Sequence, residues 1–144
     1  MPPSARADAK PHGHFLAAEA GELAGVSGTT IGQWARRGLI RSSVSEEEPR
    51  VYSVEDVAEA AIVHALLDRG VRHADVHRLI ARLGPYGEWP LSQAALATTD
   101  DNGAPLIVLR EDEGDWVLTA RGWQRPAAPL KLREVRLRLS RRAA

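Results

Sequence analysis

The stretch from Ser27 to Tyr52 constrains the fold of this chain more than any other. Ser27 predicts the start of a helix, because its hydroxyl is suited to accept a hydrogen bond from an unpaired N–H of the first turn. Ile31 and Trp34 follow at a spacing that places both on one buried helix face. Gly38 predicts the end of that helix, since glycine adopts the left-handed conformation at least cost. A polar, hairpin-like loop then returns to Tyr52, as expected of a recognition helix followed by a wing.

A shorter helix is predicted directly before this stretch. Apolar residues over 17–24 share one face, and Gly25 ends the run. Only a tight turn separates that end from Ser27. Two short helices joined so closely indicate a helix-turn-helix.

The strongest helical period in the chain begins after Ser53. Ser53 and Asp56 form an arrangement close to a capping box, and apolar residues then recur at i, i+3 and i+4 until Gly70. A fourth helix is expected over 73–83, where Gly84-Pro85 ends it. The first part of the chain is therefore predicted to be helical.

Residues 15–83 contain a series of short motifs in a fixed order. The motifs are Leu23-Ala24-Gly25-Val26-Ser27, Thr30-Ile31, Trp34, Arg37-Gly38-Leu39-Ile40, Arg50-Val51-Tyr52-Ser53, Asp56-Val57 and Arg69-Gly70-Val71. In this order they resemble the winged helix-turn-helix head of the MerR superfamily. The resemblance implies a DNA-binding domain of four helices and a wing over 14–84. Residues 1–13, which lack any apolar period, are expected to form a disordered arm.

The sequence departs from the regulators of that superfamily at two helix positions and after the fourth helix. Gly32 stands where those regulators usually have Arg, and Ala35 stands where they usually have an acidic residue. Gly84-Pro85 also excludes the long dimerising helix that usually follows the head. These departures argue against a regulator that senses drugs or metals.

The sequence pattern of the last part of the chain, 85–144, predicts a small antiparallel sheet. Short β-prone runs over 97–99, 106–110 and 116–119 are separated by polar turns, including Asp101-Asn102-Gly103. The segment from Val135 to Leu139 alternates apolar and basic residues, the period of a half-buried strand. The predicted fold class is therefore α+β, with a winged helix-turn-helix followed by a β-rich region for dimerisation or partner binding.

This β-rich region carries a second resemblance. Tyr86, Trp89-Pro90-Leu91, a turn, an apolar strand and then Gly122 and Gln124 occur in the order found in VapB-type antitoxins with a MerR-like head. The resemblance implies an autorepressing antitoxin that binds operator DNA and a PIN-like ribonuclease toxin. A protein-interaction module whose helix-turn-helix no longer binds DNA is the alternative.

The predicted DNA contacts lie on the second helix and the loop after it. Gln33 and Arg36 are suited to base edges, because Arg and Gln make bidentate contacts with guanine and adenine. Arg41 and Arg50 are suited to phosphates, whereas Tyr52 either binds a phosphate or closes the core. The same polar face also fits a helix side exposed only to water. The full set is Ser27, Thr29, Thr30, Gln33, Arg36, Arg37, Arg41, Arg50 and Tyr52.

Composition narrows the function further. The chain has 144 residues, no cysteine and a net charge of +0, which excludes disulfides and thiolate metal sites and argues against a strongly basic nucleic-acid binder. His73 and His77 are four residues apart, but nothing nearby completes a metal site, and exposed histidines are expected. Without a catalytic constellation or an apolar run for a membrane, we expect a non-enzymatic, cofactor-free protein of the cytoplasm, associated with the nucleoid.

The expected binding to DNA implies that the protein forms a homodimer. One head covers only a half-site, so sequence-specific repression normally needs two heads one helical turn apart. With the usual dimerising helix excluded, the strand expected over Val135 to Leu139 is predicted to pair edge to edge with its copy in a homodimer.

Overall fold

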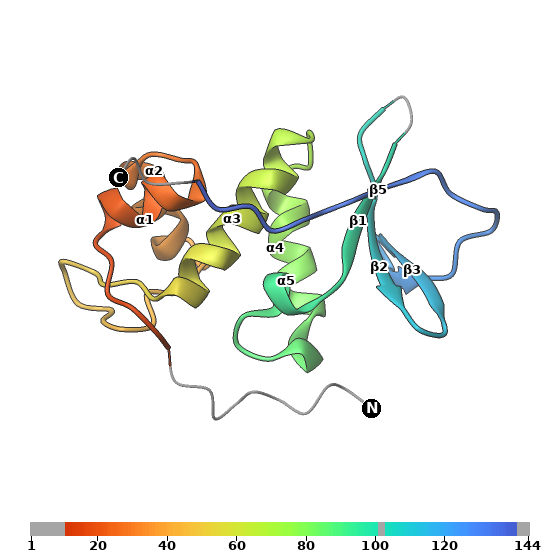
Figure 1. Cartoon of the computed structure of the whole chain (residues 1–144). Helices are drawn as coiled ribbons and strands as arrows, with labels where there is room; N and C mark the ends of the chain where they lie inside the picture. The colour runs from red at the N-terminus through yellow and green to blue at the C-terminus, as the bar shows by residue number, and fades with distance from the viewer. Residues whose placement is uncertain (1–10, 101–102, 141–144) are drawn as a thin grey trace.

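Helices make up the first part of the chain and strands the last (Figure 1). The computed structural model describes residues 11–100 and 103–140. Its helices are α1 Ala17–Ala24, α2 Gly28–Arg36, α3 Val54–Asp68, α4 His73–Arg82, the 3-10 turn η2 Gly84–Tyr86 and α5 Pro90–Gln93. Its strands are β1 Leu96–Thr99, β2 Ile107–Glu111, β3 Gly114–Thr119, β4 Gly122–Gln124 and β5 Leu132–Glu134. The predicted α+β fold is confirmed.

The helix-turn-helix forms at the predicted positions. Gly25 ends α1 with a φ of 91°, and the Ser27 hydroxyl accepts the backbone N–H of Thr30 at 3.1 Å. The turn passes very close to α1, because a Cβ added at Gly21 would lie 2.5 Å from the carbonyl oxygen of Val26. Only glycine at position 21 lets the two helices approach in this way.

Helix α3 forms the centre of the helical part. Its capping box is present, with Ser53 and Asp56 exchanging side-chain to backbone hydrogen bonds. Its inward residues belong to an apolar cluster that also contains Trp34 of α2, which is 5% exposed, and Leu79 of α4. The predicted burial of Trp34 is confirmed.

The five strands form one antiparallel sheet in the order β4-β3-β2-β1-β5, standing at one end of the helices (Figure 1). Successive side chains point to opposite faces. Leu96, Ile107 and Leu118 face the helices and join the cluster around α3, whereas Ala97 and Val108 pack on the opposite face. One apolar cluster therefore runs from the helices into the sheet, and a smaller one covers the other face of the sheet.

The strand predicted from Val135 to Leu139 is wrong. The last strand is β5, which pairs with β1 so that Thr98 lies opposite Arg133. Continuing this register would place residues after Val135 opposite the end of α5, where no strand is available to pair. Residues 136–140 therefore leave the sheet and run back across α3, and the N–H of Ser140 donates to the carbonyl of Leu23 at 2.7 Å (Figure 1).

Two other predicted segments fall partly outside the described residues. The undescribed parts are residues 1–10 of the expected arm and the first two residues of the Asp101-Asn102-Gly103 turn. At the described end of the arm, the N–H of His12 donates to Glu55 Oε1 at 2.8 Å. This bond places residue 12 against the first turn of α3.

Two buried carboxylates of α3 hold the segment that leads to the sheet. Asp56 accepts the indole N–H of Trp89 at 3.0 Å. Glu59, one turn later, accepts the N–H groups of Leu91 at 2.9 Å and Ser92 at 2.6 Å, which belong to the first turn of α5. Burial raises the pKa of Glu59, although these hydrogen bonds act in the opposite direction. The helical part and the sheet are thus joined by polar contacts as well as by the core.

We predict that Glu59→Ala destabilises the protein by about 1–3 kcal/mol, because it leaves the buried N–H of Leu91 and the part-buried N–H of Ser92 without their acceptor. Urea unfolding followed by tryptophan fluorescence measures the change. Glu22→Ala, which removes an exposed carboxylate from α1, is the matched control and should change stability by less than about 0.5 kcal/mol. Equal stabilities of the two variants would contradict the role assigned to Glu59.

Candidate nucleic-acid interface

Helix α2 has one polar face in solvent and one apolar face in the core. Thr29, Gln33, Arg36 and Arg37 are exposed, whereas Ile31 is completely buried. The four exposed positions are spaced by four, three and one residues, which places them on one side of a helix. The fold therefore brings four of the predicted contact residues together on a continuous surface.

The start of α2 adds two hydroxyl groups to that surface. The Ser27 hydroxyl donates to Thr30 Oγ1 at 2.9 Å while it accepts the Thr30 N–H. Ser27 is exposed and Thr30 is half-buried. Both predicted residues thus lie at the positive end of the helix, and their hydrogen bonds fix the position of its first turn.

The loop after α2, residues 41–52, places its two arginines against protein partners. Arg41 lies 3.2 Å from Glu88 Oε2 and over the ring of Trp89, 5.3 Å from its centroid. Arg50 donates from Nη1 to Ser42 Oγ at 3.0 Å and has Nε 3.5 Å from Glu48 Oε1. The Arg41–Glu88 pair is exposed and contributes little, so a phosphate oxygen competes with it at low cost. Arg50 is half-buried, and its partner Ser42 is buried.

The tip of the same loop is acidic. Glu46, Glu47 and Glu48 are exposed, and a bridge between Ser45 and Val51 closes the loop below them. The hairpin-like form agrees with the sequence. A negative tip repels phosphates, so this end of the loop is unsuited to contact a DNA backbone.

Tyr52 lies in the core, not on this surface. Its side chain is 1% exposed, and its backbone exchanges two 2.8 Å hydrogen bonds with that of Phe15. Burial raises the pKa of the Tyr52 phenol. Of the two roles that its sequence position allows, this placement favours closing the core.

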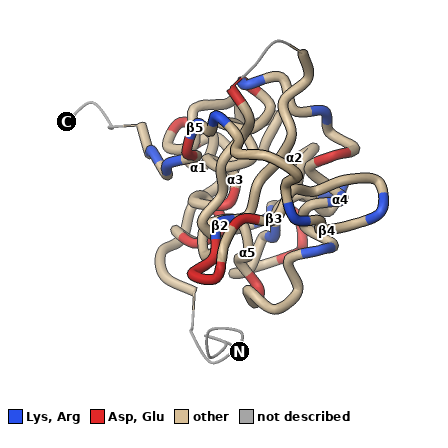
Figure 2. The backbone as a smooth tube through the Cα atoms, turned by 90° about the vertical axis from the view of Figure 1, so that its right-hand side faces the viewer, with Lys and Arg blue, Asp and Glu red and all other residues tan. Residues whose placement is uncertain are grey.

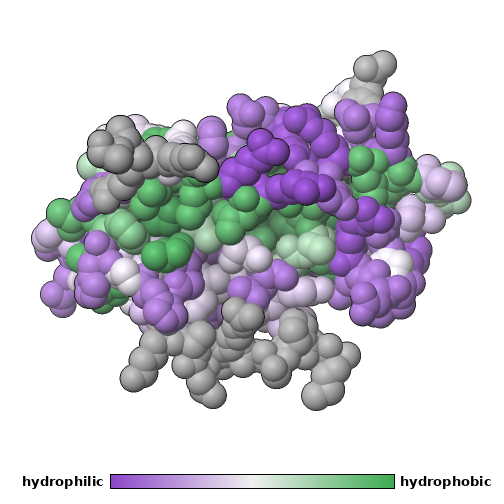
Figure 3. Space-filling view, in the orientation of Figure 1, coloured by the Kyte–Doolittle hydropathy of each residue, from purple (hydrophilic) through white to green (hydrophobic). Residues whose placement is uncertain are grey.

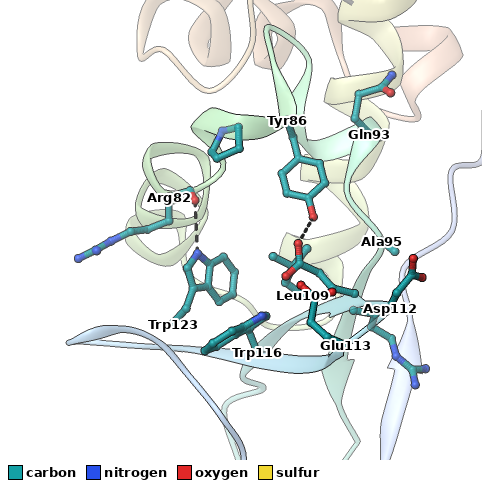
Figure 4. A pocket seen from close by; sticks show the side chains of 12 residues that line it. Arg82, Tyr86, Gln93, Ala95, Leu109, Asp112, Glu113, Trp116 and Trp123 are labelled. Atoms are coloured by element: carbon teal, nitrogen blue, oxygen red, sulfur yellow. Dashed lines mark hydrogen bonds between the residues drawn. The ribbon is translucent and has the colours of Figure 1, made fainter. Parts of the chain in front are cut away.

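A second candidate region is a cleft of about 610 Å³ between α4, η2 and the sheet (Figure 4). The Tyr86 hydroxyl donates to Glu111 Oε2 at 2.6 Å, and the indole N–H of Trp123 donates to the carbonyl of Arg82 at 3.3 Å. Trp116 lies along the same wall, with Arg125 stacked 3.8 Å from its ring centroid.

Sequence reasoning missed this cleft because its walls come from distant segments of the chain. Glu111, Asp112 and Glu113 of the β2–β3 turn belong to its lining. This acidic turn is the red stretch of backbone between β2 and β3 in Figure 2. Burial, together with the Glu111 carboxylate, raises the pKa of Tyr86 to about 12. The cleft thus combines aromatic walls with an acidic rim.

His73 and His77 are both exposed on α4. Among residues 11–100 and 103–140, no group of three or more His, Cys, Asp or Glu side chains is placed to hold a metal ion. Within the same residues, no helix is both long and apolar enough to span a membrane.

Comparison with known protein families finds a match for the helical part of the chain. Residues 16–83 match the model of the MerR HTH family regulatory protein. The matched range runs from the residue before α1 to the residue after α4. Neither the curated proteins nor the solved structures gave a match. The predicted MerR-like head is confirmed, and the match ends before the sheet.

We predict that Tyr86 ionises near pH 12, above the ordinary tyrosine value of 10.0. The fold favours the neutral phenol, so this contribution to stability is present below pH 10 and is lost as the pH rises through about 12. Tyrosinate absorbance in a Tyr52→Phe background measures the transition, because the chain has only two tyrosines.

Two carboxylate variants test the cause of this shift. Glu111→Gln should lower the pKa of Tyr86 measurably, whereas Glu113→Gln should lower it less, because Glu113 contributes least. Titration of Tyr86 near pH 10 in the otherwise unchanged protein would contradict the assigned environment.

Proposed function

Because residues 16–83 form a MerR-like head, we propose that this protein is a sequence-specific regulator of transcription that binds double-stranded operator DNA through α2. The observation that carries the proposal is the division of α2 into two faces. Its apolar face is buried in the head, and its exposed face presents Thr29, Gln33, Arg36 and Arg37. A helix of this kind fits the major groove, where base edges are distinguishable.

The side chains on that face suit contacts with both the base edges and the phosphates of DNA. Gln33 and Arg36 have the donor and acceptor geometry for adenine and guanine edges. Thr29, near the helix start, and Arg37, at its end, suit the flanking phosphates. Gly32 and the half-buried Ala35 keep bulky side chains off this part of the helix.

The 41–52 loop acts as the wing in this proposal. It follows α2 directly, and its Ser43 is fixed to Asp56 of α3 by hydrogen bonds of 2.7 Å. Arg41 exchanges its exposed partner Glu88 for a phosphate, and Arg50 exchanges its exposed partner Glu48, which adds affinity without sequence preference. The acidic tip at 46–48 then extends past the duplex.

We further propose that the protein is an autorepressing antitoxin that acts as a homodimer. Two heads are needed to read a full operator, and the aromatic, acid-rimmed cleft on the sheet side offers a surface for a basic segment of a ribonuclease toxin. The second copy cannot use a strand over 135–139, because that segment is not part of the sheet. A toxin encoded by a neighbouring gene would support this assignment.

Two observations favour a second function. The acidic tip and the net charge of +0 weaken attraction to nucleic acid. A protein-interaction module that neutralises a toxin or acts as an adaptor, without binding DNA, has these properties. DNA-binding measurements separate the two functions directly.

We predict that Gln33→Ala and Arg36→Ala each weaken binding to the preferred DNA sequence by about 1–3 kcal/mol, the usual value of one bidentate base contact. Fluorescence anisotropy measures the affinity, with DNA selected from a random library by the unaltered protein and a scrambled duplex for comparison. Arg121→Ala, in the exposed β3–β4 turn, removes the same charge far from α2 and should leave the affinity unchanged. If the unaltered protein binds selected and scrambled DNA equally, base reading by α2 is wrong.

A further inference from the structure

A cleft lined by arginines lies where the end of the chain crosses the helices. Its volume is about 790 Å³, and three elements supply its walls. Arg69 comes from the residue after α3 and Arg110 from β2. Arg133, Arg136 and Arg138 come from β5 and the segment after it. In Figure 3, hydrophilic side chains gather where this segment crosses the helices.

The positive charges of this cleft exceed the negative ones. Glu134 and Asp68 are the carboxylates in its lining. Glu134 is shared, because its Oε1 lies 3.5 Å from Arg110 and its Oε2 lies 3.1 Å from Arg136. Within the described residues, Arg133 and Arg138 form no ion pair with a carboxylate. At least two guanidinium groups are therefore left for an anion.

Arg69 is held rigidly at the back of the cleft. Its Nη1 donates to Thr98 Oγ1 at 3.0 Å and to the carbonyl of Arg133 at 2.8 Å, and its Nη2 donates to the carbonyl of Glu134 at 2.6 Å. These bonds fix the cation between α3 and β5. Burial lowers the pKa of Arg69, and the positive charge of Arg133 lowers it further. An anion between the two arginines would relieve that repulsion.

We propose that this cleft binds a small organic polyanion that carries two or more phosphate groups. Guanidinium groups match phosphate oxygens in a planar, two-point geometry, and several are present on facing walls. Ala61, Ala65 and Leu132 line the cleft between the charged groups and provide an apolar surface for the organic part. The volume is in the range of sites that enclose small ligands.

The location favours a small ligand over the DNA backbone. The cleft lining includes no residue of α2 or of the 41–52 loop, so this site is separate from the proposed DNA interface. It is also concave and spans α3, β2 and the last segment. A ligand that bridges these elements should hold residues 133–138 against α3 and thereby stabilise the fold.

Calorimetric titration of the full chain tests the proposal with two probes, inorganic tripolyphosphate and adenosine diphosphate. Both should bind saturably at one site per chain and raise the melting temperature. The double variant Arg133→Ala/Arg138→Ala should weaken binding roughly tenfold or more, since hydrogen bonds to charged groups are being lost. These two side chains have no carboxylate partner among the described residues, so circular dichroism should show an unchanged fold.

Arg121→Ala is the matched control, because it removes an exposed arginine outside the cleft. Three results would overturn the proposal. The first is no saturable binding of either probe at millimolar concentration. The second is equal weakening by the control, which indicates general attraction of anions. The third is a double variant that keeps tripolyphosphate binding but loses affinity for DNA, which would make the cleft a contact for the DNA backbone.

Discussion

The buried carboxylate of Asp56 connects the parts of this molecule. Its Oδ2 accepts the N–H and the hydroxyl of Ser43, both at 2.7 Å, and the N–H of Ser53 at 2.9 Å. Its Oδ1 accepts the indole N–H of Trp89 at 3.0 Å. A carboxylate that is 0% exposed is costly unless such donors surround it. Asp56 therefore fixes the loop after α2, the start of α3 and the approach to the sheet at one point.

This arrangement explains how a short helix can present a defined polar face. Helix α2 has only nine residues, too few to be stable alone in water. Ser27 fixes its start, and Ile31 and Trp34 anchor its inner face in the core around α3. The following loop is held to Asp56, so the surface proposed to meet DNA rests on rigid elements at both ends of α2. Rigid support of this kind favours reading a base sequence, because a defined contact geometry is preserved.

Local signals in the sequence predicted α1 to α4, whereas the short elements η2 and α5 were not predicted. Ser27 and Ser53 mark helix starts through hydrogen bonds to residues only three positions away, and the apolar period of α3 needs no knowledge of distant residues. Contacts between residues far apart in the sequence could not be predicted from such local signals. Asp56 was recognised as a capping residue, but its partner Trp89 is 33 positions away. The strand predicted over 135–139 is wrong for the same reason. Its residues do alternate between apolar and basic, but β1 begins at Leu96 and offers no strand opposite the residues after Val135. The partners of Arg41, the burial of Tyr52 and both clefts also depend on distant segments.

A double-mutant cycle of Asp56→Ala and Trp89→Phe measures whether Asp56 joins the head to the segment leading into the sheet. Trp89→Phe removes the indole N–H and keeps an aromatic ring, and Asp56→Ala removes the acceptor, which asparagine would retain in its amide oxygen. Chemical unfolding of the four proteins gives the interaction free energy. The structure predicts a coupling of about 0.5–3 kcal/mol, as for residues in direct contact. Effects that add within about 0.3–0.5 kcal/mol would contradict the claim that this bond joins the two parts.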